Sequence, residues 1–320
     1  MSQSPACERL PMSCSDHSLR ASYRQCRRVA RRAGSSFYPS FFLLPRVKRE
    51  AMYALYAFLR HTDDLGDAPA PAPWRREALA RWREAFSKAV GQGGDGPDGG
   101  AAKREEPPSE LPDARLGPSL LPALADTVRR YRIPVEHLHA VIDGVEMDLG
   151  PCRYETYAEL EQYCHRVASA VGLACIHIWG FRGAEAIEPA RCSGVAFQLT
   201  NILRDLKEDA QSGRVYLPLE DLRRFGCSEQ ALLAGVVHPP LMRLLEFQIA
   251  RARRCYEQGA RLTDYLEPDG KRVFGTMAAI YRRLLEEIDR HKADLLRRRI
   301  RLGRWQKLLI VARWFLSAPL

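Results

Sequence analysis

One short acidic segment has both the residue types and the spacing that chemistry on an anionic ligand would need. Residues 56–67 read YAFLRHTDDLGD and follow a strongly apolar stretch. On a helix Asp63 and Asp67 lie four residues apart and share a face, with Arg60 and Tyr56 one and two turns behind on the same side. The pattern predicts a pair of carboxylates presented together at the end of a helix.

A second acidic segment repeats this arrangement. Residues 198–209 read QLTNILRDLKED, in which Asn201, Asp205 and Asp209 recur every fourth residue. The other positions of this segment are apolar nearly all round, so we expect a buried helix. Its polar stripe should therefore face an interior cavity.

Carboxylates placed in this way call for a cation. Like charges four residues apart on a helix repel each other, and removing them from water costs more still unless a cation compensates. Magnesium takes oxygen ligands, binds few protein carboxylates and keeps open positions for phosphate oxygens. A lone D-D-x-x-D is most often a solvated turn. Two such segments, each ending an apolar helix and each accompanied by an arginine, favour a site in which magnesium bridges the two faces through a diphosphate.

The elements that must position these residues are helical. Three-to-four-residue apolar periodicity runs over lengths that no strand reaches, and no convincing strand-like alternation is present. The periodic stretches are residues 46–60, 158–180, 190–209, 240–262 and 272–299. The sequence therefore predicts an all-α fold.

Composition divides the chain into three parts. Residues 1–17 are predicted to be a polar, flexible tail. Residues 91–118 are rich in Gly and Pro, and helical periodicity on both sides predicts an insertion within one domain that covers residues 18–300. Residues 301–320 form a basic amphipathic segment, which suits either an interfacial helix on an anionic membrane or a closing bundle helix with a solvated basic face.

The net charge and the cysteines indicate which classes of partner and which cellular compartment to expect. The chain has 320 residues and a formal net charge of +10, which favours nucleic acid, an anionic membrane face or phosphorylated small molecules. Nine scattered cysteines without a C-x-x-C pair predict reduced thiols. With neither a signal peptide nor a spanning segment in the sequence, we expect a cytoplasmic protein, or one bound peripherally at the inner face of the cell membrane.

Two long strings make the chain resemble the squalene/phytoene synthases, the head-to-head prenyl diphosphate synthases. They are residues 163–172 (YCHRVASAVG) and residues 194–209 (GVAFQLTNILRDLKED), the second followed by GRVYLP at 213–218. Supporting strings are SSFY at 35–38, REAMYALYAF at 49–58 and MDL at 147–149. The resemblance covers about Ser35 to Gln306 and implies an isoprenoid-synthase helical bundle around a deep central cavity.

The same resemblance assigns roles to individual residues. It implies two or three magnesium ions held by Asp63, Asp67, Asn201, Asp205 and Asp209. It implies diphosphate binding by Ser35, Ser36, Arg60, Arg204 and Arg214, with a further basic position near Arg298 or Arg299. It places Tyr56, Tyr163 and Tyr281 with Arg60 and Arg204 in the catalytic set, although each tyrosine could equally be a packed side chain with one satisfied hydroxyl.

The implied reaction joins two prenyl diphosphates. One donor loses diphosphate, the C2–C3 double bond of the second attacks the resulting allylic cation, and proton loss closes a cyclopropane. Water would quench the cation, so the cavity must be dry. The apolar residues expected to line it are Phe37, Phe41, Phe42, Leu55, Val167, Val171, Leu199 and Leu203.

The product is left open among three outcomes. The leading prediction is presqualene diphosphate from two farnesyl diphosphates, in the squalene/hopanoid route. The alternative is phytoene from two geranylgeranyl diphosphates, for carotenoid biosynthesis, and NADPH is needed only if the enzyme completes squalene formation. A remote alternative is a non-catalytic basic helical protein that binds membranes or RNA. We expect a prenyl diphosphate substrate and downstream isoprenoid enzymes as partners, and no nucleic acid.

Overall fold

The computed structural model describes residues 14–34, 37–91 and 116–316, and within them it contains helices but no strand. The prediction of an all-α fold is confirmed. The elements are α1 (Cys14–Arg32), η1 (Tyr38–Leu43), α2 (Arg46–Gly66), α3 (Ala72–Gly91), α4 (Leu116–Tyr131), α5 (Val135–Met147), α6 (Tyr157–Cys164), η2 (His165–Ser169), α7 (Ala170–Trp179), η3 (Ala184–Ala186), α8 (Ile187–Arg204), α9 (Leu206–Gln211), α10 (Leu219–Phe225), α11 (Glu229–Leu233), α12 (Pro239–Ala260), η4 (Arg261–Asp264), α13 (Pro268–Arg290), η5 (Lys292–Asp294) and α14 (Arg304–Leu316).

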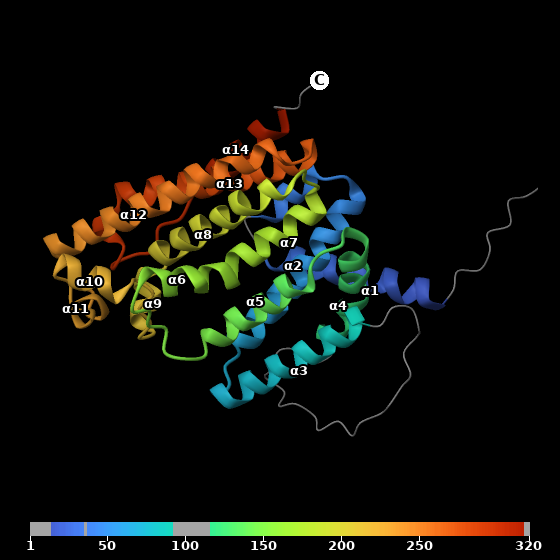
Figure 1. The fold of residues 1–320 in the computed structure, drawn as a ribbon, viewed down its shortest axis with the longest axis horizontal. Coiled ribbons are helices and arrows are strands. Elements are labelled where there is room, and N and C mark those ends of the chain that lie inside the picture. The colour runs from blue at the N-terminus through green and yellow to red at the C-terminus, as the bar shows by residue number, and fades with distance from the viewer. Residues whose placement is uncertain (1–13, 35–36, 92–115, 317–320) are drawn as a thin grey trace, which may run out of the picture.

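The long helices form one bundle in which α8 is central. It packs against α12, α13, α7 and η2, while α2 packs against α1, α3, α4, α5 and α7 (Figure 1). One apolar core surrounds α2 and includes Leu55 and Phe58, and a second lies between α8 and α12. Phe37 and Phe197 pack against both cores. The region between the two cores is where the chain leaves space for a cavity.

The C-terminal end of α2 is held by polar contacts inside the first core. The Trp82 indole N–H donates to the Thr62 hydroxyl at 2.9 Å, and that hydroxyl donates to the Phe58 carbonyl at the same distance. The Phe58 ring also packs on the Trp82 ring, with 5.5 Å between their centroids. Fixing Thr62 in this way fixes the direction in which Asp63, the next residue, leaves the helix.

The string at residues 163–172 forms an uninterrupted helical rod with a π-helical turn, η2, in its middle. α8 lies directly against this turn: a Cβ atom on Gly194 would come within 2.4 Å of the Ser169 Cα. The Ser169 hydroxyl donates to the Arg191 carbonyl at 2.7 Å. Because a π-turn widens the helix locally, the residues it carries are turned out of the regular register, and π-turns recur at functional sites for this reason.

Several boundaries differ from those predicted. α1 begins at Cys14, inside the predicted tail 1–17, and the predicted insertion 91–118 overlaps α3 at Gly91 and α4 from Leu116, with residues 92–115 outside the described part of the chain. The helix predicted over 190–209 is two helices that meet at Asp205. The break is one residue long, and the Asp209 N–H still donates to the Asp205 carbonyl at 2.9 Å. Helical periodicity therefore continues through the break and conceals it in the sequence.

Candidate active site

A cavity of about 590 Å³ lies between α2, α5, η2, α7, α8 and α13. Charged and polar groups lie at the ends of α2 and α8, and apolar side chains such as Trp179 and Phe274 also line the cavity. Both predicted acidic segments reach it through Asp63, Asp67 and Asp205. The arrangement suits a ligand with an anionic head and a hydrocarbon tail.

The first acidic face ends α2. Asp67 caps the helix, and its N–H donates to the Asp63 carbonyl at 2.8 Å, so the two carboxylates stay one turn apart. Arg60 also lines the cavity but forms its ion pair with Asp64, at 2.6 Å. The Asp63 side chain is accessible to the water of the cavity, yet the enclosing protein and the charge on Asp67 raise the pKa of Asp63 to about 7. The charge of Arg60 acts in the opposite direction and only partly offsets these effects.

The second acidic face lies where α8 gives way to α9. Two arginines hold Asp205: Arg204 Nε lies 2.7 Å from its Oδ1, and Arg299 Nε lies 2.7 Å from the same atom. Asn201 lines the cavity beside it. Asp209, one turn further on, pairs with Arg214 at 3.5 Å, and neither of these two residues lines the cavity. Burial and the neighbouring Asp205 raise the pKa of Asp209 to about 6, against the opposing charge of Arg214.

The donor set fits a hard divalent cation. Asn201 Oδ1 is buried and accepts no hydrogen bond from the described residues, although an amide oxygen in that position needs a partner. Oxygen donors of this kind are the ligands of magnesium. Within the described residues no three acidic, histidine or cysteine side chains converge closely enough to form a complete metal cage. Such an ion would take one or two oxygens from the protein and the rest from water and phosphate, as magnesium commonly does.

A buried carboxylate, Asp148, joins the site and was not among the predicted site residues. It lines the cavity and accepts hydrogen bonds from the hydroxyls of Tyr163 at 2.9 Å and Tyr216 at 2.8 Å. Burial raises the pKa of Asp148, while those two hydrogen bonds act in the opposite direction. The signal that could have found it is the MDL string at 147–149, which lies on the short segment after α5.

The other two predicted tyrosines also line the cavity. The Tyr281 ring stacks on Phe37, with 5.6 Å between centroids, and lies 4.7 Å from the Phe197 ring. Its hydroxyl is hydrogen-bonded to Arg204 and Asn201. Tyr56 meets the Phe41 ring edge-on at 6.3 Å. The cavity therefore combines aromatic faces with hydroxyls that are tied to the polar groups of the second acidic face.

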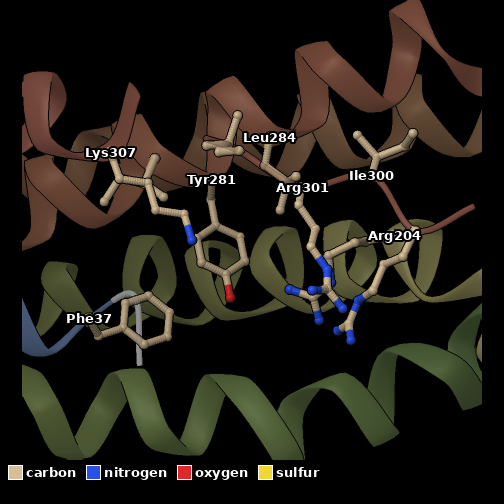
Figure 2. A pocket seen from close by; sticks show the side chains of 10 residues that line it. Phe37, Arg204, Tyr281, Leu284, Ile300, Arg301 and Lys307 are labelled. Atoms are coloured by element: carbon tan, nitrogen blue, oxygen red, sulfur yellow. The ribbon is translucent and has the colours of Figure 1, made fainter. Parts of the chain in front are cut away.

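A second, smaller cavity of about 320 Å³ adjoins the first and shares Phe37, Arg204 and Tyr281 with it. Figure 2 shows Arg301 reaching towards Arg204, with Lys307 of α14 on the other side of Tyr281. Arg299 lines it as well, and none of its ten lining residues is acidic. The nearby charges of Arg204 and Arg301 add to burial in lowering the pKa of Lys307. This concentration of positive charge suits phosphate oxygens.

The apolar lining differs in part from expectation. Phe37, Phe41, Leu55, Val167 and Val171 line the cavity. The expectation was wrong for the other three: Phe42 is 46% exposed, and Leu199 and Leu203 are buried in the core between α8 and α12. Phe41 and Phe42 are consecutive in a 3₁₀ turn, so their side chains point about 120° apart. Ser35 and Ser36 lie outside the described residues.

Comparison with known proteins assigns the chain to a family. A family model described as squalene/phytoene synthase matches residues 30–306, which is most of the chain. The chain belongs to the squalene/phytoene synthase family. Its members are prenyltransferases with divalent-metal-dependent binding of prenyl diphosphates.

Individual relatives in this family carry two kinds of name. A phytoene synthase of Arthrospira platensis is 34% identical over 97% of this chain and 95% of its own, and a 15-cis-phytoene synthase of Synechococcus elongatus is 33% identical over 91% of both. Among solved structures, a dehydrosqualene synthase superposes with a TM-score of 0.77 at 26% identity, covering 95% of this chain and 100% of its own. A squalene synthase of Alicyclobacillus acidocaldarius superposes with a TM-score of 0.73 at 25% identity, covering 87% and 98%. These similarities show that the chain has the helical isoprenoid-synthase fold.

Proposed function

We propose that this protein condenses two farnesyl diphosphates head to head to presqualene diphosphate, a step of the squalene/hopanoid route. One observation carries the reaction class: two acidic faces from distant parts of the chain line one cavity that continues into an apolar chamber. The donor length is supported by the squalene-type names of the two solved structures that superpose with TM-scores of 0.77 and 0.73.

Acidic residues and arginines have different roles when the first donor loses its diphosphate. Magnesium held by Asp63, Asp67, Asn201 and Asp205, with Asp209 behind them, would neutralise charge that develops on the departing diphosphate. Arg204 and Arg299 bind phosphate oxygens, and their shared pairing with Asp205 fixes the direction of both guanidinium groups. Arg60 supplies a further cation beside the first face, while Arg214 acts through Asp209.

The walls protect and guide the cation. C1 of the ionised donor bonds to the C2–C3 double bond of the second donor, and loss of one proton closes the cyclopropane ring. Aromatic faces of Phe37, Tyr56 and Tyr281 stabilise positive charge along this path, by about 0.5–2 kcal/mol per ring. Tyr163 accepts the proton as its own hydroxyl proton passes to Asp148, whose raised pKa favours that transfer.

Phytoene synthesis from two geranylgeranyl diphosphates is the second candidate. The observation that favours it is the names of the curated relatives, which are phytoene synthases at 33–34% identity over more than 90% of this chain. The same residues would perform the same steps on a longer hydrocarbon chain.

Product analysis separates these candidates. Purified protein with magnesium is incubated with each donor, with and without NADPH, and the extracted lipid is identified after phosphatase treatment. We expect presqualene alcohol from farnesyl diphosphate without reductant; squalene that forms only with NADPH would instead show a complete squalene synthase. Phytoene from the C20 donor would establish the second candidate. A folded protein that makes no more product than its Asp205→Ala variant from either donor would refute both.

We also propose that the protein works as a peripheral membrane protein and passes its product to downstream isoprenoid enzymes. The helices of the described residues do not include one that is long and apolar enough to cross a bilayer. A lipophilic product nevertheless requires an apolar phase to receive it.

A further inference from the structure

Exposed apolar side chains are concentrated on two segments of the molecule. Among the described residues seven large apolar side chains are exposed, and five of them lie on η1, on the first turn of α2 and on α14. Trp305 is 79% exposed and Leu309 is 70% exposed, far more than burial of apolar surface would allow in a closing helix of a bundle. We call the five side chains the docking face: Phe42, Val47, Trp305, Leu308 and Leu309.

The segment made of η1 and the first turn of α2 lies along α13, from the middle of that helix to its first turn. The Phe37 ring, just before η1, stacks on Tyr281, and Lys48 in the first turn of α2 lies 3.0 Å from the Asp269 carboxylate at the beginning of α13. Phe42 and Val47 lie between these two anchors in the sequence.

α14 follows α13 in the same direction. Near its start, Lys307 shares the small cavity with Tyr281 (Figure 2). Near its end, the Trp314 ring lies so close to Gly275 that a Cβ there would come within 2.3 Å of it. η1 also contacts α14 directly. The two segments therefore run side by side along α13, at the edge of the molecule where α13 and α14 lie in Figure 1.

Both segments are basic. Residues 38–49 and 297–316 contain no acidic residue, and α14 carries its arginines and lysine among Trp and Leu. Arg46, Arg301 and Arg313 are exposed, and the Arg49 guanidinium lies 5.2 Å from the centre of the Phe42 ring. Apolar side chains flanked by exposed arginines are the pattern that binds the interface of an anionic bilayer.

We propose that the docking face binds the surface of a bilayer that contains anionic phospholipids. Its apolar side chains enter the boundary between headgroups and acyl chains, and the surrounding arginines pair with lipid phosphates. The binding itself follows from the surface alone. Its consequence rests on the proposed function: Phe41 lines the cavity while the adjacent Phe42 belongs to the docking face, so a hydrocarbon product would leave the protein beside the bilayer.

Vesicle flotation without substrate tests the proposal. The full chain is mixed with vesicles of phosphatidylcholine alone or of phosphatidylcholine with phosphatidylglycerol, at low and high salt. The double variant Trp305→Gln/Leu309→Gln is compared with Val135→Gln/Val236→Gln, which changes the two large apolar side chains that are exposed outside the docking face in the described part of the chain. We expect the wild type to bind anionic vesicles, salt to weaken that binding, and the first variant to lose roughly tenfold or more in partition coefficient while the control does not.

Three flotation results would overturn the proposal: no flotation of the wild type with anionic vesicles, equal binding to neutral vesicles at all salt concentrations, or the same loss in both variants. A wild-type dimer that the first variant alone converts to monomer would assign the face to a second copy of this chain instead.

Both variants should keep their thermal unfolding transition and their turnover in detergent. A protein that floats but makes no product would leave the docking face standing and refute only the enzymatic proposal.

Discussion

The Arg299 guanidinium lies 2.7 Å from the Asp205 carboxylate, so the segment that follows α13 is tied to the second acidic face on α8. The neighbouring Arg298 points elsewhere and pairs with Asp294 on the surface, at 2.8 Å. Of the two arginines at this basic position, the structure therefore connects only Arg299 to the cavity region. Arg299 also lines the small basic cavity, which the shared Arg204 connects with the larger one.

This relationship predicts different effects for two adjacent substitutions. Arg299→Ala removes the charged contact to Asp205 and, in the proposed function, a contact to substrate phosphate, so we expect kcat/KM to fall roughly 10- to 100-fold. Arg298→Ala should change it less than about twofold, because a surface ion pair contributes little. Steady-state kinetics of both variants provide the measurement. Equal losses of kcat/KM in the two variants would show that the position of Arg299 beside Asp205 does not matter for the reaction.

The Tyr163–Asp148 hydrogen bond predicts coupled substitutions. Tyr163→Phe and Asp148→Asn should each lower kcat by about 10²-fold or more if the pair moves the proton. The double variant should be little worse than either single variant. Tyr154→Phe removes a neighbouring ring hydroxyl and is the matched control, with kcat near the wild type. Additive losses in the double variant would argue against a shared proton path.

The raised pKa values of Asp63 and Asp209 predict how pH affects the metal-free protein. Each carboxyl has a higher pKa in the folded protein than in the unfolded chain, so the folded state binds the proton more tightly. That stabilisation is present at low pH and is lost as pH rises through about 6 for Asp209 and about 7 for Asp63. The contribution of these two carboxyl groups to the free energy of unfolding should therefore be smaller at about pH 8 than at about pH 5, as measured by denaturant unfolding in EDTA.

The Asp63→Asn variant isolates that contribution. Its stability should fall less over this pH range, whereas the surface variant Asp143→Asn should follow the wild type. Magnesium should raise the melting temperature of the wild type at alkaline pH and have a smaller effect on Asp63→Asn. An unchanged pH profile in Asp63→Asn would contradict the assignment.

The close approach of α8 to η2 predicts a stability difference between two glycines. An added Cβ at Gly194 meets the backbone of Ser169 at 2.4 Å, and backbone atoms cannot move aside alone, so Gly194→Ala should cost about 1–3 kcal/mol or more. At Gly172 the nearest contact would be an ordinary 3.5 Å, and Gly172→Ala should be neutral or stabilising by up to about 1 kcal/mol. Urea unfolding of both variants gives their free energies of unfolding. Equal values for Gly194→Ala and Gly172→Ala would refute the packing argument.

The sequence by itself determined the helical fold class and the family. Both depend on local patterns: apolar periodicity persists through each helix, and the two acidic stripes repeat every fourth residue whatever surrounds them. The same local logic identified Asp63, Asp67, Asn201 and Asp205, which the structure brings to one cavity. The family resemblance, rather than any local pattern, implied a further basic position near Arg298 or Arg299, and the structure connects Arg299 to that region.

Only the tertiary structure decided what meets across the bundle. Asp148 joins the site because Tyr163 on α6 and Tyr216 after α9 converge on it, and sequence periodicity carries no information on contacts between separate elements. Asp209 shares the stripe of Asp205 but lies one turn beyond the residues that line the cavity, where it pairs with Arg214. Phe42 was expected inside and faces out, since in a 3₁₀ turn the packing of η1 on α13 selects which of two adjacent rings is buried.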